Sequence, residues 1–264
     1  MMDNHLKQRL HSGECVYGIM LSELYVPNMS RLIAMCGYDF LLVDCEHGYF
    51  DMTQVANLIA VAEGVNLPVI IRVAQPSRTM ITKYLDMGAR GILLANVKDE
   101  EEARRLLDVC LYAPDGDRGI STFRAHTGYN DGDTFSIMRN ANACNVVICQ
   151  IESPHAVEMV DQILALKGVD GVLVGPNDLT QHMGIFSEFE NPAFHQVLEH
   201  VATCARAAGK WSGVITGNMA LAQKCRSLGM TCFSAGSELS TLAKGAKMQL
   251  KAIREATTGE ETTP

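Results

Sequence analysis

The sequence contains neither a long basic run nor a long apolar run. Its 22 lysines and arginines are outnumbered by 30 acidic residues among 264 residues, and no basic block is longer than a pair. No positive face is therefore expected to neutralise the phosphates of a nucleic acid, which argues against a nucleic-acid partner. No apolar run approaches the roughly 20 residues that a membrane-spanning helix needs, so no membrane partner is predicted.

Signals for cysteine pairing are also missing. The nine cysteines are an odd number, none belongs to a CxxC pair, and residues 1–18 carry no signal-peptide pattern. These features predict a cytoplasmic protein whose reduced thiols mostly fill the core. Cys45 lies inside an acidic motif, and we interpret it as a structural thiol rather than a nucleophile.

What the sequence does contain is a regular alternation of short apolar runs with stretches of helical periodicity. Helix-start signals occur at Asp51, at Asp99 and at Ser153-Pro154. The apolar runs are continuous rather than alternating with polar residues, which is typical of strands buried on both faces. The eight predicted strands are Val16–Leu21, Phe40–Val43, Val69–Val73, Gly91–Leu94, Val146–Ile151, Val172–Val174, Trp211–Ile215 and Thr231–Ser234.

Eight strand–helix units in a chain of this length predict a single-domain α/β fold, a (β/α)8 TIM barrel. We expect the barrel to occupy residues 1–255 and a polar, flexible tail to occupy 256–264. A doubly wound open sheet is the alternative, but no GxGxxG motif follows the first strand to support it. The connection 112–143 is unusually long, and such connections are typical of lids or interface elements.

The active site of a TIM barrel lies at the C-terminal ends of its strands, so polar residues at these ends are candidates. They concentrate on strands two to six, whereas strands seven and eight end in small residues. The candidates are Asp44, Glu46 and His47 after strand two, Arg72 on strand three, Asn96 after strand four, Gln150 and Glu152 at strand five, and Asn177 and Asp178 after strand six.

Glu152 and Asp178 follow neighbouring predicted strands, which lie about 4.8 Å apart in a parallel sheet. Two carboxylates that converge on one point normally need a proton or a hard cation between them. Two oxygen ligands with open positions suit Mg²⁺ or Mn²⁺, which keep water and accept substrate oxygens. The alternative is a pair of helix-capping acids, because Asp178 is also placed to cap the segment Leu179–Met183.

Arg72 and His47 each allow a functional and a structural interpretation. Arg72 ends a buried run, and its planar cation suits a developing oxyanion or a carboxylate. The alternative for Arg72 is a buried ion pair with Asp44 or Glu46. His47 suits a general base near neutral pH, although a single loop histidine is often a plain surface residue.

Six motifs occur together along most of the chain, from about Gly18 to Lys247. They are Val43–Gly48, Ile71-Arg72, Leu85–Ala89, Tyr112–Gly119, Gln150–Glu152 and Gly175–Leu179. Each is weak alone, but the set resembles the HpcH/HpaI family of metal-dependent, class II pyruvate aldolases. This family includes 4-hydroxy-2-oxoheptanedioate and 2-dehydro-3-deoxy sugar acid aldolases.

The resemblance implies a barrel that assembles as a homohexamer, a trimer of dimers, with its last helix exchanged between subunits. It implies that Glu152 and Asp178 bind a divalent cation, Mg²⁺ or Mn²⁺ with Co²⁺ as a further candidate. Pyruvate would add its carboxylate and keto oxygens to this cation. Arg72 would stabilise the enolate oxygen, and His47 would move protons through a metal-bound water.

Further positions acquire roles only through the resemblance. Gln150 would line the pyruvate site, and the backbone at Asn177-Asp178 would meet the pyruvate carboxylate. Met20 replaces a tryptophan that is common in relatives, and Asn96 adds a polar group near the aldehyde. Val214 follows strand seven where relatives place a residue that affects the fit of the aldehyde.

Asp86 matches an acid that the family pairs with its catalytic histidine. The sequence places Asp86 at the end of the third helix, on the face of the barrel opposite the expected site. Either Asp86 reaches the site of a neighbouring subunit, or Asp44 orients His47 instead.

The predicted function is reversible cleavage of a 4-hydroxy-2-oxo acid to pyruvate and an aldehyde. Cleavage beside a ketone leaves an enolate, whose charge a metal and a fixed arginine can hold. No lysine stands at a strand end to form an imine, since Lys98 and Lys210 lie elsewhere. The alternatives are oxaloacetate decarboxylation through the same enolate, a lyase for acyl-CoA thioesters, for which no basic groove is evident, and a non-catalytic keto-acid-binding barrel.

Overall fold

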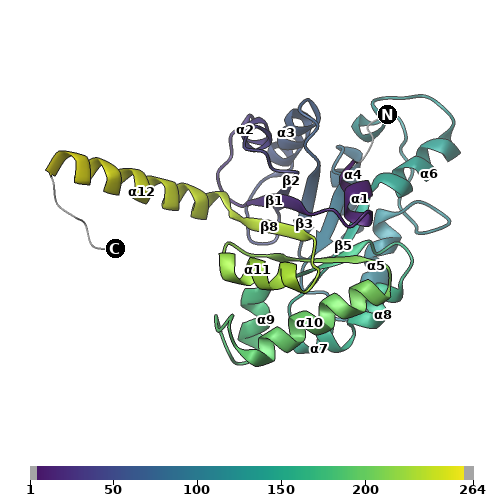
Figure 1. Ribbon diagram of the computed structural model, residues 1–264. Helices are drawn as coiled ribbons and strands as arrows, with labels where there is room; N and C mark the ends of the chain where they lie inside the picture. Colours follow the sequence, from purple (N-terminus) through teal and green to yellow (C-terminus); the bar gives the residue numbers. More distant parts are fainter. Residues whose placement is uncertain (1–4, 259–264) are drawn as a thin grey trace.

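The computed structural model describes residues 5–258 and contains a closed barrel of eight parallel strands (Figure 1). Each strand pairs with the next, and the last pairs with the first. The predicted TIM barrel is confirmed, and a sheet without edges excludes the doubly wound alternative. The strands are β1 (Val16–Leu21), β2 (Phe40–Asp44), β3 (Val69–Val73), β4 (Gly91–Leu94), β5 (Val146–Ile151), β6 (Gly171–Val174), β7 (Trp211–Ile215) and β8 (Cys232–Ser237).

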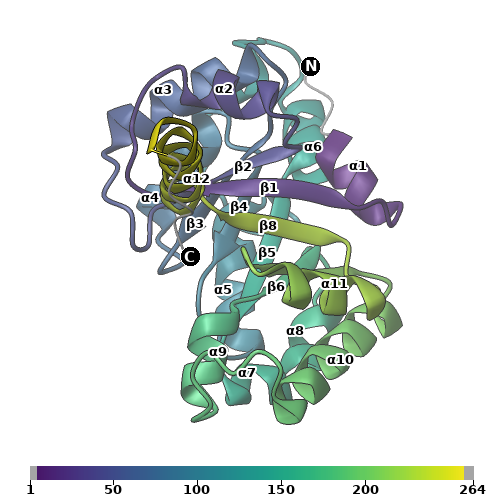
Figure 2. The ribbon, with the colours of Figure 1, turned by 60° about the vertical axis from the view of Figure 1, so that its left-hand side comes forward.

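The helices surround the barrel, and several begin at the predicted signals (Figure 2). Asp51 and Gln54 each accept the other's backbone N–H at 2.8 Å, which completes a capping box. The segment after β5 forms two short helices that meet at Met159, instead of the single helix predicted from the sequence. The helices are α1 (His5–His11), α2 (Met29–Met35), α3 (Met52–Glu63), α4 (Arg78–Asp86), α5 (Glu100–Cys110), η1 (Ala125–Thr127), α6 (Thr134–Cys144), α7 (Pro154–Glu158), α8 (Val160–Ala165), α9 (Pro176–His182), α10 (Pro192–Ala207), α11 (Met219–Ser227) and α12 (Glu238–Thr258).

Alternate strand residues face the barrel interior and the helices, so the core has two layers. Phe40, Leu42 and Ile70 belong to the interior layer, which α1 closes at the N-terminal end of the barrel. A side chain at Gly18 would place its Cβ 2.2 Å from the Phe40 ring, so only glycine lets this ring fill the interior. Leu41 belongs to the outer layer, between the strands and the helices. Polar residues that continue the interior rows therefore reach the mouth of the barrel.

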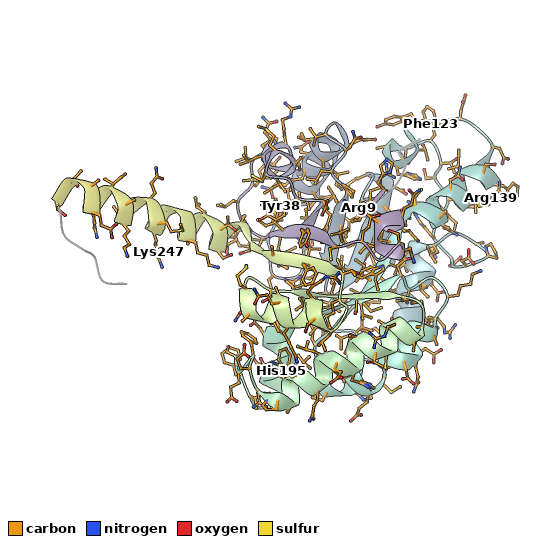
Figure 3. All side chains as sticks on the ribbon, viewed as in Figure 1. Arg9, Tyr38, Phe123, Arg139, His195 and Lys247 are labelled. Carbon is orange, nitrogen blue, oxygen red and sulfur yellow. The ribbon has the colours of Figure 1, made fainter. Side chains whose placement is uncertain are left out.

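Helix α12 projects away from the barrel as a long rod (Figures 1 and 2). Its side chains, including Lys247, stand clear of the barrel (Figure 3). Its apolar residues Leu242, Met248, Leu250 and Ile253 are each at least half exposed. The helix includes residues 256–258 of the predicted tail, and residues 259–264 lie outside the described part of the chain.

The long connection 112–143 carries η1 and leads into α6. It follows the C-terminal end of helix α5 and precedes β5, so it lies on the N-terminal face of the barrel. This position is opposite the strand ends that carry the candidate residues, so the connection is not a lid over its own site. Within residues 5–258, no helix is both long and apolar enough to cross a bilayer.

Candidate active site

The candidate site lies at the C-terminal end of the barrel, where polar side chains continue the interior rows of β2, β3 and β5. Asp44, Arg72, Gln150 and Glu152 are between 1% and 7% exposed. Asp44 and Arg72 are register partners on neighbouring strands. Buried polar groups are costly unless they have partners, so their convergence needs a physical reason.

Asp44 and Arg72 form a buried bidentate ion pair. The Nε and Nη2 atoms of Arg72 donate to the two carboxylate oxygens of Asp44 at 2.9 and 2.6 Å. Burial favours a higher pKa for Asp44, but the hydrogen bonds and charge of Arg72 outweigh it and lower the pKa. The ion-pair interpretation of Arg72 is therefore observed. The ion pair does not use every nitrogen of the Arg72 guanidinium, because Nη1 forms no hydrogen bond within residues 5–258.

Glu152 lies in a cradle formed by neighbouring strand ends. Its carboxylate accepts hydrogen bonds from the Gln150 side chain and, at 3.1 Å, from the backbone N–H of Asn96. Asn96 has a φ of 47°, in the left-handed region, which turns the chain after β4. A Cβ at Gly175 would lie 2.4 Å from a carboxylate oxygen of Glu152, so the close approach requires glycine.

Glu152 carries a strongly perturbed acid group. Burial raises its pKa to about 8, and the negative charges of Glu46 and Asp178 contribute in the same direction. Burial and the neighbouring negative charges therefore favour the protonated form of Glu152 when no cation is nearby. The side-chain oxygen of the neighbouring Gln150 is buried and has no hydrogen-bond partner within residues 5–258.

Glu46 is a further member of this cluster, and the sequence predicts it both as a strand-end candidate and as a possible ion-pair partner of Arg72. Its carboxylate lies 3.4 Å from Nε of Arg72, and burial raises its pKa, as does the charge of Asp178. Its position two residues after Asp44, at the end of the same strand, was the sequence signal that it could belong to the site. Asn177 and Asp178 lie in the first turn of helix α9, which begins at Pro176 after β6, and Asn177 is exposed.

The donor set fits a hard divalent cation. Three carboxylates, Glu46, Glu152 and Asp178, repel one another in a partly buried space, and a dication would offset that repulsion. Among residues 5–258 there is no group of three or more side chains arranged as a complete metal cage. The assignment of Glu152 and Asp178 as direct ligands of such a cation stays a prediction.

His47 lies at the rim of the site. Its side chain is 71% exposed, and Nε2 lies 3.8 Å from Glu46. Asp44 accepts the backbone N–H of His47 at 3.4 Å, and its carboxylate is otherwise held by Arg72 and the N–H of Glu46. Asp44 therefore does not orient the imidazole ring in this chain.

Two predicted residues lie away from the site. Asp86 ends helix α4 on the N-terminal face, where Arg118 donates to its carboxylate at 2.7 Å. Val214 is fully buried in the outer layer, so it faces the helices and not the aldehyde. Its neighbour Ile215 packs against the interior layer and reaches the mouth, because successive strand residues face opposite sides.

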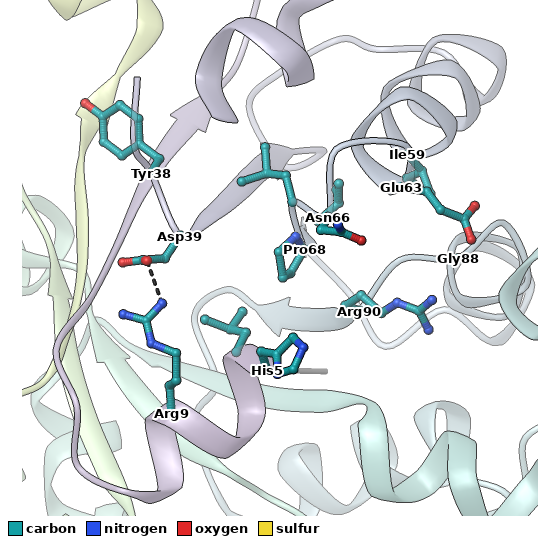
Figure 4. Close-up of a pocket in the computed structure, with 13 residues that line it drawn as sticks. His5, Arg9, Tyr38, Asp39, Ile59, Glu63, Asn66, Pro68, Gly88 and Arg90 are labelled. Atoms are coloured by element: carbon teal, nitrogen blue, oxygen red, sulfur yellow. Dashed lines mark hydrogen bonds and ion pairs between the residues drawn. The ribbon is translucent and has the colours of Figure 1, made fainter. Parts of the chain in front are cut away.

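Cys45 and the large cavity of the opposite face do not contribute to this chemistry. Burial raises the pKa of the Cys45 thiol to about 11, so it stays protonated, as a structural thiol should. A cavity of about 490 Å³ lies at the N-terminal end of the barrel. There Arg9 pairs with Asp39, and Arg90 extends past Gly88 (Figure 4).

A (β/α)8 barrel with clustered carboxylates and a fixed arginine at its mouth suits an enzyme that stabilises an anionic intermediate. Comparison with known proteins gives the family. The model of the HpcH/HpaI aldolase/citrate lyase family matches residues 19–245. The chain therefore belongs to this family, and it is an aldolase, a carbon–carbon lyase.

Individual relatives agree with this assignment. The chain is 32% identical over 237 residues to the 2-keto-3-deoxy-L-rhamnonate aldolase of Salmonella gallinarum (strain 287/91 / NCTC 13346), covering 89% of this chain and 88% of the relative. It is 29% identical to an HpcH/HpaI aldolase from Desulfitobacterium hafniense DCB-2, with a TM-score of 0.90 and coverage of 96% and 98%. It is also 29% identical to the citrate synthase SbnG, with a TM-score of 0.86 and coverage of 98% and 100%.

Proposed function

We propose that this aldolase reversibly cleaves a 4-hydroxy-2-oxo acid of the 2-keto-3-deoxy sugar acid type to pyruvate and an aldehyde. The substrate class follows from similarity to the rhamnonate-derived aldolase. The cation would be Mg²⁺ or Mn²⁺, held by Glu152 and Asp178. The observation that carries this proposal is the buried Glu152 carboxyl group, which is 3% exposed, accepts hydrogen bonds from Gln150 and the N–H of Asn96, and lies near the negative charges of Glu46 and Asp178. A dication would stabilise this arrangement.

The chain's own groups divide the work of cleavage. When bound, a dication would supply Lewis-acid polarisation of the 2-oxo group. Asp44 fixes the Arg72 guanidinium, whose remaining Nη1 donor can hold negative charge that develops on the enolate oxygen. Gln150 would line the pyruvate site, and the backbone at Asn177-Asp178 would bind the carboxylate.

His47 would take the proton from the 4-hydroxyl group as the carbon–carbon bond breaks. Among the described residues, the carboxylate nearest to its exposed ring is that of Glu46, 3.8 Å from Nε2. Asp86 has one carboxylate oxygen that forms no hydrogen bond within residues 5–258, but it lies on the opposite face. A second copy of the chain can bring the two together, and a hexamer joined through exchanged α12 helices would do so.

The decisive test is pyruvate release, measured with lactate dehydrogenase, from a 2-keto-3-deoxy sugar acid and from oxaloacetate in parallel. Chelation should abolish release, and Mg²⁺ or Mn²⁺ should restore it. Asp178→Asn should lose both metal binding and activity, whereas Asp161→Asn on the outer helix α8 should lose neither. Activity that persists in excess chelator would contradict the proposed mechanism. Faster turnover of oxaloacetate than of any hydroxy-oxo acid would make decarboxylation the main reaction.

A further inference from the structure

Three successive backbone carbonyl groups at the end of β5 have partners from three different segments. The carbonyl oxygen of Gln150 accepts the N–H of Val97, which follows β4, at 3.2 Å. That of Ile151 accepts the N–H of Gly175, which follows β6, at 3.1 Å. The strand ends at Ile151, so the carbonyl group of Glu152 lies beyond the parallel ladder. It needs a donor from outside the sheet, because a buried carbonyl group without a partner is costly.

The side chain of His182 provides this donor. Its Nδ1 atom lies 2.8 Å from the backbone carbonyl oxygen of Glu152. Since a carbonyl oxygen can only accept, Nδ1 carries the hydrogen and donates it. Glu152 is 3% exposed, whereas His182 is an exposed residue. The imidazole ring therefore reaches from the surface to the end of β5 and satisfies a carbonyl group that the sheet leaves unpaired.

Hydrogen bonds to the backbone of β5 and of the residue after it hold α9 at both of its ends. Directly before the helix, Gly175 donates its N–H to Ile151. His182, the last residue of the helix, donates to Glu152. Asp178 lies in the first turn, between these two points, and no side chain caps the start of the helix. The helix that carries Asp178 is therefore held directly against the strand end that carries Glu152.

This attachment matters because the two carboxylates are held in different ways. The Glu152 side chain has donors of its own, the Gln150 amide and the N–H of Asn96. The Asp178 carboxylate forms no hydrogen bond within residues 5–258, so the helix that carries it sets its position. A shift of α9 relative to β5 would therefore change the separation of the two carboxylates directly.

We infer that His182 is a positioning residue, whose hydrogen bond to the Glu152 carbonyl group keeps Asp178 and Glu152 converging on one cation. This inference rests on the proposed function, which assigns the two carboxylates as ligands. His182 acts through the main chain and does not itself bind the cation. Removing a group that orients metal ligands from outside typically lowers metal affinity about 10–100-fold.

Binding of Mn²⁺ to the full-length protein after removal of its metal, measured by electron paramagnetic resonance, tests this inference without substrate. His182→Phe keeps a ring of similar size but has no N–H group, so its Mn²⁺ affinity should fall about 10–100-fold. His182→Asn places an amide nitrogen where the histidine has Nδ1, so it should bind Mn²⁺ nearly as the wild type does. Asp178→Asn should lose the binding, which identifies the site that is measured.

His195→Phe is the matched control, because it removes a similar hydrogen bond elsewhere. The Nε2 atom of His195 lies 2.9 Å from the backbone carbonyl oxygen of Phe189 and joins α10 to the segment before it. Both phenylalanine variants should lower the melting temperature by a similar small amount, but only His182→Phe should lose Mn²⁺ affinity. An equal loss of affinity in His195→Phe would overturn the inference, because general destabilisation would then explain the effect.

The outcomes separate failure of this inference from failure of the proposed function. Equal Mn²⁺ affinity in the wild type and His182→Phe would refute the positioning role and leave the proposed function intact. A His182→Asn variant that binds Mn²⁺ as weakly as His182→Phe would refute it as well, because the donated hydrogen bond would then not matter. If the affinities follow the expected order but the wild type cleaves no oxo acid, only the proposed function fails. A wild type that binds no Mn²⁺ would overturn both.

Discussion

Replacing Arg72 tests whether its ion pair serves the fold, the reaction or both. The Arg72 side chain is 8% exposed and that of Asp44 is 2% exposed, so Arg72→Met leaves a buried carboxylate without its cation. Removing one partner of a buried pair costs about 3–5 kcal/mol. In a domain of this size about 1 kcal/mol shifts the melting temperature by roughly 2–4 °C, so we expect a fall of roughly 6–20 °C.

The double variant Asp44→Asn/Arg72→Met separates the two roles. It removes both charges, so most of the lost melting temperature should return. Pyruvate release should not return, because a missing donor to a developing oxyanion costs about 10²–10³ in kcat. Calorimetry and the lactate dehydrogenase assay, at a temperature where all variants are folded, provide the two measurements. Turnover that recovers with stability would refute a chemical role for Arg72, and an Arg72→Met variant that melts like wild type would refute the buried-pair argument.

Three further predictions concern the site and α12. Metal affinity, measured by calorimetry, should fall up to tenfold per pH unit below about 8, because the raised pKa of Glu152 makes its proton compete with the cation; a flat profile would contradict this. Gly175→Ala should displace that carboxylate and weaken metal binding without unfolding the barrel, whereas Gly64→Ala, whose Cβ has no contact closer than 3.5 Å, should be neutral. If the proposed hexamer forms through α12, deleting residues 246–264 should dissociate it and abolish activity, while the melting temperature of the barrel changes little because Met248 and Ile253 are more than half exposed in the single chain. A truncated chain that stays assembled in light scattering would contradict this.

The sequence alone predicted the barrel and the four buried polar residues at its mouth, for one physical reason. Parallel strands buried on both faces give continuous apolar runs, and the residues that follow those runs must all reach the same end of the barrel. Arg72 and Glu152 could therefore be placed together although 80 positions separate them. Asp44 and Gln150 follow by the same argument.

The prediction of single strand residues failed where it depended on which face of the strand each residue occupies. Val214 and Ile215 differ by one position, and strand residues alternate between two faces, so an error of one residue exchanges the mouth for the helix layer. The local sequence of β7 does not reveal which residues face the interior, because Trp211, Val214 and Ile215 are all apolar. The structure resolves it through the packing partners of each side chain.

The partner of Asp86 was beyond local sequence reasoning for a different reason. Arg118 lies 32 positions away, in a connection with no regular periodicity, and the pair forms only because two helices end on the same face. The signal that could have suggested this pair is that Asp86 and Arg118 both lie near the ends of helices on the same face of the barrel.

The apolar interior of the barrel both stabilises the fold and sets the electrostatics of the proposed cation site. Leu42, Ile70 and Ile148 lie directly before the site residues in the interior rows, so the mouth has an apolar floor. That floor removes water from Glu152 and raises its pKa, which makes the metal-free site electrostatically unfavourable. Replacing the acid with an apolar residue of similar size would relieve this strain, and natural proteins keep such unfavourable groups where function requires them. The same burial that makes Glu152 costly in the free chain would give the proposed cation a water-poor environment, where its effect on a developing negative charge is strongest.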